Sequence, residues 1–454
     1  MIPIAARMFC HLQEALWGRN TFSVLKDLKE SQYWPREKIK ELQLERLRKL
    51  VSGAYAHTSY WKTLMDESGI LPESIKTLED LKRFPLLEKE TLRARKEDMV
   101  WRDEGRRLQF IRTSGSTNEA LQFYTNSNRE AQINAARIRG HEWVGVKKHD
   151  KEVYFWGSPA EVSKHDRMRY VRDFFVNDGF ADGLELTPGV VSKLVKQWKR
   201  YRPKCLFGYP CSFVFTAQAA EKANIDLKEL KNYGLEVICT TSEVLTDLDR
   251  EVISNAFGIP VCDSYGLKEA GLIGHECTHQ TMHTMDEQII LETIDPVSLE
   301  PTTGEGELVV TSLISNVMPI IRYRTGDVVT LSDKKCECGL SLNSIKISGG
   351  RIADFLVNKN GTWIAGYSFI YICRTVPGVV KFQVRQEEIG KVKVLLAVDE
   401  HFPPDGKEQV KEKMRKRLKS DDEIMVEIVD DIKPAPSGKY RPVVSKVSEG
   451  LRGQ

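Results

Sequence analysis

The sequence predicts an α/β protein with a large N-terminal domain of α/β subdomains and a small, mobile α+β domain at the C-terminus. Between about residues 105 and 265, short β-like runs alternate with helical ones, a pattern typical of partly parallel sheets covered by helices. Near residue 350 the pattern changes to that of a separate unit. We therefore expect an N-terminal domain over residues 1–350 and a C-terminal domain over 351–454.

The individual elements follow from periodicity and capping residues. Over residues 37–56, apolar positions recur every three to four residues among charged ones, which predicts a helix with one buried stripe. Thr187 and Pro188 predict a helix start, as cap and first helical residue, and this helix runs to about residue 201. Further helices are predicted over 217–222, 247–257 and 407–419. Strands are predicted over 108–112, 152–156, 204–207, 235–239, 260–263, 288–292, 307–312, 381–386, 391–398 and 425–429.

Composition excludes several function classes. The chain has 454 residues, of which 41% are hydrophobic and 29% charged, and its net charge is +3. This balance gives no electrostatic argument for nucleic acid or a membrane surface as partner. Apolar runs stay below the roughly 18–20 residues that a membrane helix needs, and we do not interpret the start as a signal peptide. We therefore expect the protein to be located in the cytoplasm.

The nine cysteines are scattered, which indicates free thiols or metal ligands before disulfides. Five of them are interpreted as small buried hydrophobic residues, and His141 receives no catalytic role. These five are Cys205, Cys211, Cys239, Cys262 and Cys373.

A loop of hydroxyl residues and one glycine follows the strand predicted at 108–112. It consists of Thr113, Ser114, Gly115, Ser116 and Thr117. Such a loop can turn several N–H and hydroxyl groups toward one anion, which suits phosphate oxygens. An ordinary polar turn would look similar, and the loop lacks the Gly-Lys-Ser/Thr ending of a Walker motif.

Four further motifs follow in order along the chain. They are Ser264–Glu269, Arg322–Asp327, Gly350–Asp354 and Pro436–Arg441. Each alone is common, but with the hydroxyl loop their order resembles the adenylate-forming superfamily. In detail the chain resembles the phenylacetate–CoA ligase family, in the branch associated with capsular polysaccharide biosynthesis, from Arg36 to Val447.

The resemblance implies a role for each motif. The Thr113–Thr117 loop would hold the β- and γ-phosphates of ATP, and Glu269 would hold Mg²⁺. Asp327 would accept hydrogen bonds from the ribose hydroxyls, while Lys439 would bridge the attacking carboxylate and the α-phosphate. The remaining positions are Tyr265 and Gly266 at the adenine or acyl site, Arg351 at ribose or phosphate oxygens, Ser242 and Glu243 beside the adenine, and Tyr209 and Pro210 in the acyl pocket.

The implied reaction is ATP-dependent activation of a carboxylic acid as an acyl-adenylate, with release of pyrophosphate and then transfer to CoA or another thiol. Two alternatives stay open: an amine or hydroxyl acceptor on a sugar, amino acid or cofactor, and a degenerate, non-catalytic nucleotide-binding protein. The second is suggested by Asn118 and Glu119, where family loops usually continue with glycine and often lysine. Ala353 stands at a hinge position that is often aspartate, which argues against a fast two-step cycle driven by domain rotation. The sequence leaves the acid, the acceptor, including a carrier protein, and the oligomeric state open.

A metal site is expected from two cysteine-containing segments. Cys336 and Cys338 form a Cys-x-Cys pair, and Cys277 and His283 lie upstream. Together they would give a closed Cys₃His set, which is typical of structural zinc sites. Members of the family that the chain resembles carry the same Cys and His spacings. Two alternatives remain, namely His279 in place of His283 and four unrelated side chains in loops.

Overall fold

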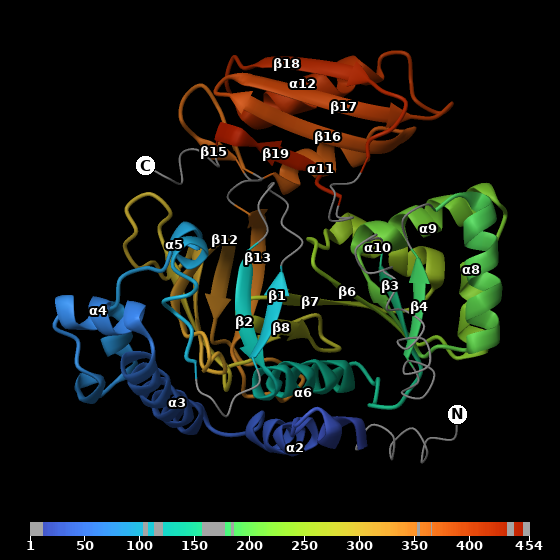
Figure 1. Ribbon diagram of the computed structural model, residues 1–454. Coiled ribbons are helices and arrows are strands. Elements are labelled where there is room, and N and C mark those ends of the chain that lie inside the picture. The colour runs from blue at the N-terminus through green and yellow to red at the C-terminus, as the bar shows by residue number, and fades with distance from the viewer. Residues whose placement is uncertain are drawn as a thin grey trace. The chain divides into compact units, whose positions relative to one another are not determined.

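The chain divides into two units in the computed structural model (Figure 1). The structure describes residues 12–102, 108–112, 121–156, 178–182, 186–351, 355–364, 366–433 and 440–447. Unit 1 comprises Met1–Glu292, Val309–Arg324 and Ser332–Ile345, and unit 2 comprises Thr293–Leu308, Thr325–Leu331 and Lys346–Gln454. The predicted combination of a large α/β part and a small α+β part is confirmed. The predicted domain boundary at residue 350 stays a prediction.

Helices form most of the first 100 residues. They are α2 (Thr21–Ser31), α3 (Arg36–His57), α4 (Ser59–Glu67) and α5 (Lys89–Ala94), with short 3₁₀ turns at Pro72–Ser74 and Leu78–Arg83. The helix predicted over 37–56 is confirmed by α3, whose Leu47, Leu50 and Val51 enter the core. Trp61 of α4 is fully buried there, and its Nε1 donates to the carbonyl oxygen of Pro319 at 3.2 Å.

A parallel sheet forms the middle of unit 1. Its strands are β3 (Glu152–Trp156), β4 (Asp178–Asp182), β5 (Cys205–Gly208), β6 (Val237–Thr241) and β7 (Val261–Leu267), in the order β7-β6-β5-β3-β4. The connecting helices are α8 (Pro188–Tyr201), α9 (Pro210–Lys222) and α10 (Asp247–Phe257). They pack on Leu206 and Ile238, whereas Cys205, Phe207 and Cys239 point to the opposite face. Strands β5 and β6 are buried on both sides, as inner parallel strands usually are.

Helix α6 (Ser127–Trp143) belongs to that opposite face, since the His141 ring lies 5.3 Å from that of Phe207. Helix α2 runs beside α6 (Figure 1), and Trp143 Nε1 donates to Gln32 Oε1 at 2.8 Å.

The sheet continues beyond β7 to eleven strands in all, in the order β10-β11-β12-β13-β9-β8-β7 and then the parallel strands, and the pairs β7–β8, β8–β9 and β9–β13 are antiparallel. The added strands are β8 (Gly271–Glu276), β9 (Met282–Thr284), β10 (Ile289–Ile294), β11 (Glu305–Ser312), β12 (Ile320–Ser332) and β13 (Ser344–Arg351). The Arg322–Asp327 motif lies inside the long strand β12, although a Gly-Asp pair is more typical of a turn. Separately, β1 (Leu108–Arg112) and β2 (Gln122–Asn126) form a hairpin that flanks the hydroxyl loop, which itself lies outside the described residues.

The C-terminal part has a sheet and core of its own. Its sheet has the order β18-β17-β16-β19, from β16 (Val379–Glu388), β17 (Lys391–Val398), β18 (Glu423–Ile428) and β19 (Val443–Ser445). Strands β14 (Leu356–Val357) and β15 (Trp363–Ile364) and helices α11 (Tyr367–Arg374) and α12 (Gly406–Leu418) complete it. Phe369, Val384, Leu396 and Met414 are fully buried in this core.

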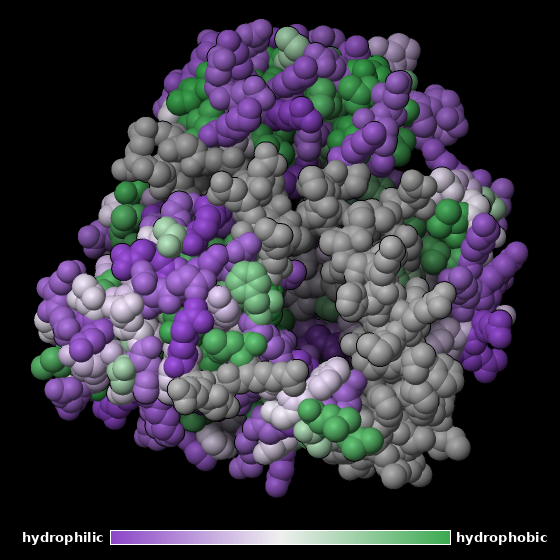
Figure 2. Space-filling view, in the orientation of Figure 1, coloured by the Kyte–Doolittle hydropathy of each residue, from purple (hydrophilic) through white to green (hydrophobic). Residues whose placement is uncertain are grey.

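The described helices include none that is both long and apolar enough to span a bilayer. Polar and charged residues cover much of the described face shown in Figure 2, with apolar residues in small groups.

Candidate functional site

Three of the predicted site segments lie at one edge of the parallel sheet. In the strand register Gly208 pairs with Thr240, and Thr241 pairs with Ser264. The carboxyl ends of β5 and β6, and this part of β7, therefore meet at one edge, where open α/β sheets bind ligands. The structure thus brings together Tyr209-Pro210, Ser242-Glu243 and Tyr265-Gly266.

A hydrogen bond links two of these segments. Pro210 is the first residue of α9, after Tyr209 as N-cap. The backbone N–H of Cys211 donates to Glu243 Oε2 at 3.3 Å. A carboxylate at a helix N-terminus is stabilised by the helix dipole, so the predicted adenine-side segment is held against the predicted acyl-pocket segment.

The close spacing of strands β5 and β3 near this edge depends on a glycine. A Cβ atom on Gly208 would lie 2.2 Å from the carbonyl oxygen of Phe155 in β3. Only glycine lets β5 come this close to β3.

Glu269, the predicted magnesium ligand, has a defined position in unit 1. Tyr323 is fully buried, and its hydroxyl donates to Glu269 Oε1 at 3.0 Å. The buried Arg129 donates through Nη2 to the carbonyl oxygen of Lys268 at 2.5 Å and through Nε to Ser315 Oγ at 3.2 Å. Burial lowers the pKa of Arg129 to about 10, with Glu130 and Glu269 opposing the shift, so its guanidinium is charged at neutral pH.

Sequence reasoning missed both supporting residues. Tyr323 lies inside the Arg322–Asp327 motif, and this position is the one feature of the sequence that could indicate a role for it in the site. Arg129 follows the N-cap of α6, where a charged residue usually faces solvent.

The other predicted nucleotide residues belong to unit 2 or lie outside the described residues. Asp327 is buried on the part of β12 that belongs to unit 2, and its N–H donates to Thr325 Oγ1 at 3.0 Å. Arg351 is the last residue of β13. Residues 113–117 and Lys439 lie outside the described residues.

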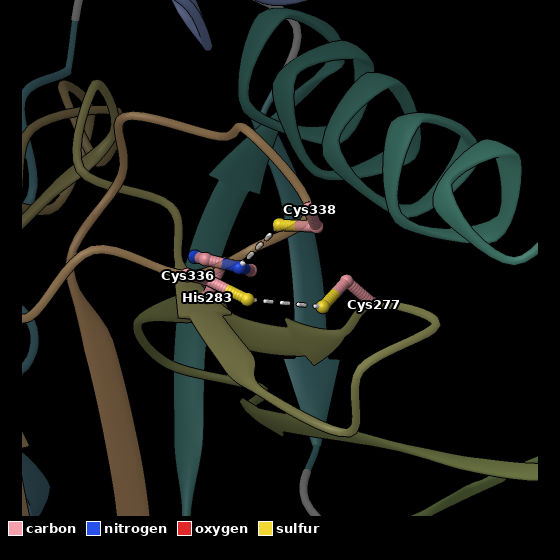
Figure 3. Close-up of side chains that lie close together, drawn as sticks. All are labelled: Cys277, His283, Cys336 and Cys338. Carbon is pink, nitrogen blue, oxygen red and sulfur yellow. Dashed lines mark hydrogen bonds between the residues drawn. The ribbon is translucent and has the colours of Figure 1, made fainter.

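The four predicted zinc ligands converge in unit 1 (Figure 3). One ligand atom from each of Cys277, His283, Cys336 and Cys338 lies within 4.8 Å of the others. The Sγ atoms of Cys277 and Cys336 are 3.8 Å apart, and His283 Nε2 is 3.1 Å from Cys338 Sγ. Three sulfurs and one imidazole nitrogen are a donor set that fits zinc.

The surroundings orient these ligands. His283 Nδ1 lies 3.3 Å from the carbonyl oxygen of Leu342, which leaves Nε2 toward the thiols, the arrangement usual for metal-binding histidines. Burial lowers the pKa of His283, which keeps the imidazole neutral. A turn with Gly339 at a φ of 83° reverses the chain after Cys338. The alternative ligand, His279, lies outside the group, with Nδ1 3.7 Å from Glu337 Oε2.

Known proteins are similar to this chain both in sequence and in fold. A family model described as the CapK C-terminal domain matches residues 356–446. Protein CapK of Staphylococcus aureus is 22% identical over 417 residues, which is 90% of this chain and 89% of that protein. Phenylacetate-coenzyme A ligase of Thermus thermophilus is 28% identical over 349 residues, 71% of this chain and 72% of that protein. The chain is thus similar to phenylacetate-coenzyme A ligases and to protein CapK, and these similarities support the phenylacetate–CoA ligase-like family, CapK branch, that the motif order indicated.

Solved structures of adenylate-forming CoA ligases show the same fold as this chain. The crystal structure of 2-hydroxyisobutyryl-CoA ligase in the postadenylation state, in complex with R3-HIB-AMP, has a TM-score of 0.73 at 17% identity and covers 94% of both chains. The anthranilate CoA ligase AuaEII in complex with anthranoyl-AMP has a TM-score of 0.54 at 14% identity, over 73% of this chain and 64% of that one. The resemblance inferred from motif order is confirmed.

Proposed function

We propose that this protein is an AMP-forming acid ligase. It activates a carboxylic acid with ATP as an acyl-adenylate, releases pyrophosphate, and passes the acyl group to CoA or another thiol. The observation that carries the proposal is the meeting of Tyr209-Pro210, Ser242-Glu243 and Tyr265-Gly266 at the carboxyl edge of one parallel sheet. The relatives named above as CoA ligases, two of them solved with acyl-AMP compounds, support it.

The chemistry explains why these residue types are needed. A carboxylate and ATP repel each other, so the site has to supply positive charge where negative charge accumulates. Glu269 would hold Mg²⁺, which shields the phosphate oxygens when it is bound. The Tyr323 hydroxyl would fix the position of the Glu269 side chain, and Arg129 would hold the backbone at Lys268 through its hydrogen bond to the Lys268 carbonyl oxygen.

The remaining nucleotide contacts are proposals drawn from the family motifs. Asp327 would accept from the ribose hydroxyls and Arg351 would pair with ribose or phosphate oxygens. The Thr113–Thr117 loop would hold the β- and γ-phosphates, and Lys439 would be the point charge between acid and α-phosphate. Residues 351–454 would then act as a lid that carries Lys439 in for the first step and away for the second.

We further propose that Cys277, His283, Cys336 and Cys338 hold a structural zinc ion. The set supplies all four tetrahedral positions, so the ion has no open position for a substrate. It would join the segment after β8 to the segment before β13.

The test is ATP–pyrophosphate exchange with a panel of carboxylic acids that includes aromatic acids and amino acids. We expect exchange with at least one acid, its loss in Lys439→Ala with ATP binding retained, and wild-type exchange in the matched control Lys433→Ala. Removal of a positioned charge typically costs on the order of 10²–10³ in rate. Exchange at the wild-type rate in Lys439→Ala would refute the role of that lysine. A protein that binds neither ATP nor AMP would refute the function as a whole.

The acceptor is tested with the acid that the panel identifies. We expect acid-dependent consumption of CoA, with formation of a thioester that hydroxylamine cleaves. An amide or ester formed with an amine or hydroxyl acceptor, and no thioester, would instead assign the acyl-transfer half-reaction to that acceptor.

A further inference from the structure

A second cluster of potential metal ligands lies on the α6 face of the parallel sheet. It consists of His141 in the last turn of α6, Cys239 in β6 and His275 in β8. One ring nitrogen of each histidine and the sulfur of Cys239 lie within 4.8 Å of one another. All three side chains are essentially inaccessible to solvent, at 1%, 0% and 0% exposure. The cluster involves none of the residues assigned above.

The outer nitrogen of each histidine faces an acceptor. His275 Nδ1 lies 2.8 Å from the carbonyl oxygen of Glu276. His141 Nδ1 lies 3.3 Å from Glu152 Oε2, at ion-pair distance although not aligned as a hydrogen bond. A carbonyl or carboxylate behind Nδ1 is the usual second partner of a metal-binding histidine, because it fixes the tautomer that exposes the Nε2 lone pair.

The Nε2 atoms of both histidines are buried and have no hydrogen-bond partner among the residues that the structure describes. A buried polar atom without a partner costs about 1–3 kcal/mol, so two together within one group are unfavourable unless something binds there. A metal ion would satisfy both nitrogens at once.

The surroundings are shaped around these rings. A Cβ atom on Gly140 would lie 2.6 Å from the His275 ring, so α6 leaves space for this imidazole only because residue 140 is glycine. The rings of His141 and His275 have centroids 5.4 Å apart, and Phe207 and Trp143 lie around them. An apolar shell of this kind excludes water and strengthens coordination of an ion by the few polar atoms inside it.

We propose that His141, Cys239 and His275 bind a second transition-metal ion of the borderline class, such as Zn²⁺. Two imidazoles and a thiolate suit this class and do not suit Mg²⁺ or Ca²⁺. Binding forms one metal–sulfur and two metal–nitrogen bonds, and the proton of the Cys239 thiol passes to solvent. An adjoining thiol can approach as a fourth donor, since Cys262 Sγ lies 2.8 Å from Cys239 Sγ.

The two metal sites are neighbours but separate. Trp143 lies between them, with ring centroids 6.2 Å from His275 and 5.8 Å from His283. The second ion would tie α6 to β6 and β8. Because β6 leads to Ser242-Glu243, it would brace an edge of the proposed nucleotide site without taking part in the reaction.

The test is a metal titration of the full chain, refolded with Co²⁺ in place of Zn²⁺. We expect two ions per chain. The first should show a strong thiolate-to-cobalt absorption band and the second a weaker one, because it has fewer thiolate ligands. Saturation at one ion per chain would overturn the proposal, and this result needs no variant.

Variants then locate the second ion. Cys336→Ser/Cys338→Ser should retain one ion with the weaker band, and adding Cys239→Ala should remove it. The matched control is Cys373→Ala, which removes a fully buried thiol from unit 2 and should leave both ions. An ion that survives Cys239→Ala, or a Cys239–Cys262 disulfide found by mass spectrometry of the unreduced protein, would contradict the assignment. None of these outcomes depends on the acid ligase activity.

Discussion

Replacing Arg139 by methionine should be among the most destabilising single changes in unit 1. Arg139 of α6 pairs with Glu287 through two contacts, Nη1 to Oε1 at 2.6 Å and Nη2 to Oε2 at 3.1 Å. The two side chains are 1% and 0% exposed. Arg139 also donates to the carbonyl oxygen of Leu28 at 2.9 Å, and Ser31 Oγ donates to Glu287 Oε1 at 2.6 Å. The pair therefore joins α2, α6 and the segment before β10.

The magnitude follows from what the substitution leaves behind. Without the guanidinium, the Glu287 carboxylate stays buried, and the Ser31 hydroxyl is its remaining side-chain donor among the described residues. Removal of one partner of a buried ion pair costs about 3–5 kcal/mol, which is a large part of the roughly 5–15 kcal/mol free energy of unfolding of a typical protein. The double variant Arg139→Met/Glu287→Met should cost much less than the sum of the two single variants, because no buried charge is left unpaired.

The assay is urea unfolding followed by tryptophan fluorescence. This signal reports on unit 1, since Trp363 is the one tryptophan among eight that belongs to unit 2. The matched control is Lys49→Met, which breaks an exposed pair with Glu45 within α3 of unit 1, where the two side chains are 73% and 60% exposed, and it should change the free energy of unfolding little. A loss below about 1 kcal/mol in Arg139→Met, or additive costs in the double variant, would refute the argument from buried charge.

Three further predictions concern pH, backbone packing and the metal. Burial raises the pKa of Asp286 to about 6, so between pH 4 and 6 the folded state keeps a proton that the unfolded chain releases. As the pH rises from 4 to 6, this residue should therefore lower the free energy of unfolding by about 3 kcal/mol. Urea unfolding of Asp286→Asn at several pH values should lack this component of the pH dependence. Gly208→Ala should cost about 1–3 kcal/mol because its Cβ meets the Phe155 carbonyl, whereas Gly189→Ala, with open space around its Cβ, should be neutral or stabilising; equal melting temperatures would count against the close approach of β5 and β3. Cys338→Ser should weaken zinc binding at the Cys₃His set by more than about 100-fold in competition with a chromophoric chelator, and unchanged affinity would remove Cys338 from the set.

Local signals predicted the elements that depend on local physics. The range of α10 agrees with the expected 247–257, and Thr187 Oγ1 accepts from the N–H of Val190 as a helix cap should. Helix α9 was placed too late, because it begins at Pro210 and not at residue 217. Pro210 at the first helical position is the local signal that marks this start.

The Arg322–Asp327 motif illustrates the opposite case. Gly326 has a φ of 79°, which a turn would also require, yet the segment continues as a strand. The backbone N–H of Gly326 donates to Glu307 Oε1 at 3.1 Å, and Glu307 is distant from Gly326 in the sequence. A partner of this kind is invisible to periodicity, so only the folded chain shows that this glycine belongs to a strand.

The sequence by itself predicted the α/β class, the resemblance to the phenylacetate–CoA ligase family, the segments that meet at the sheet edge and the four side chains of the proposed Cys₃His site. Each of these is recorded in residue type, spacing or order along the chain. Only the tertiary structure decided that Tyr323 and Arg129 support the Glu269 segment, that Arg139 and Glu287 form a buried pair, and that His141, Cys239 and His275 meet. These side chains come from elements without any fixed spacing between them, and their proximity is set by which faces of α6 and the sheet are buried together.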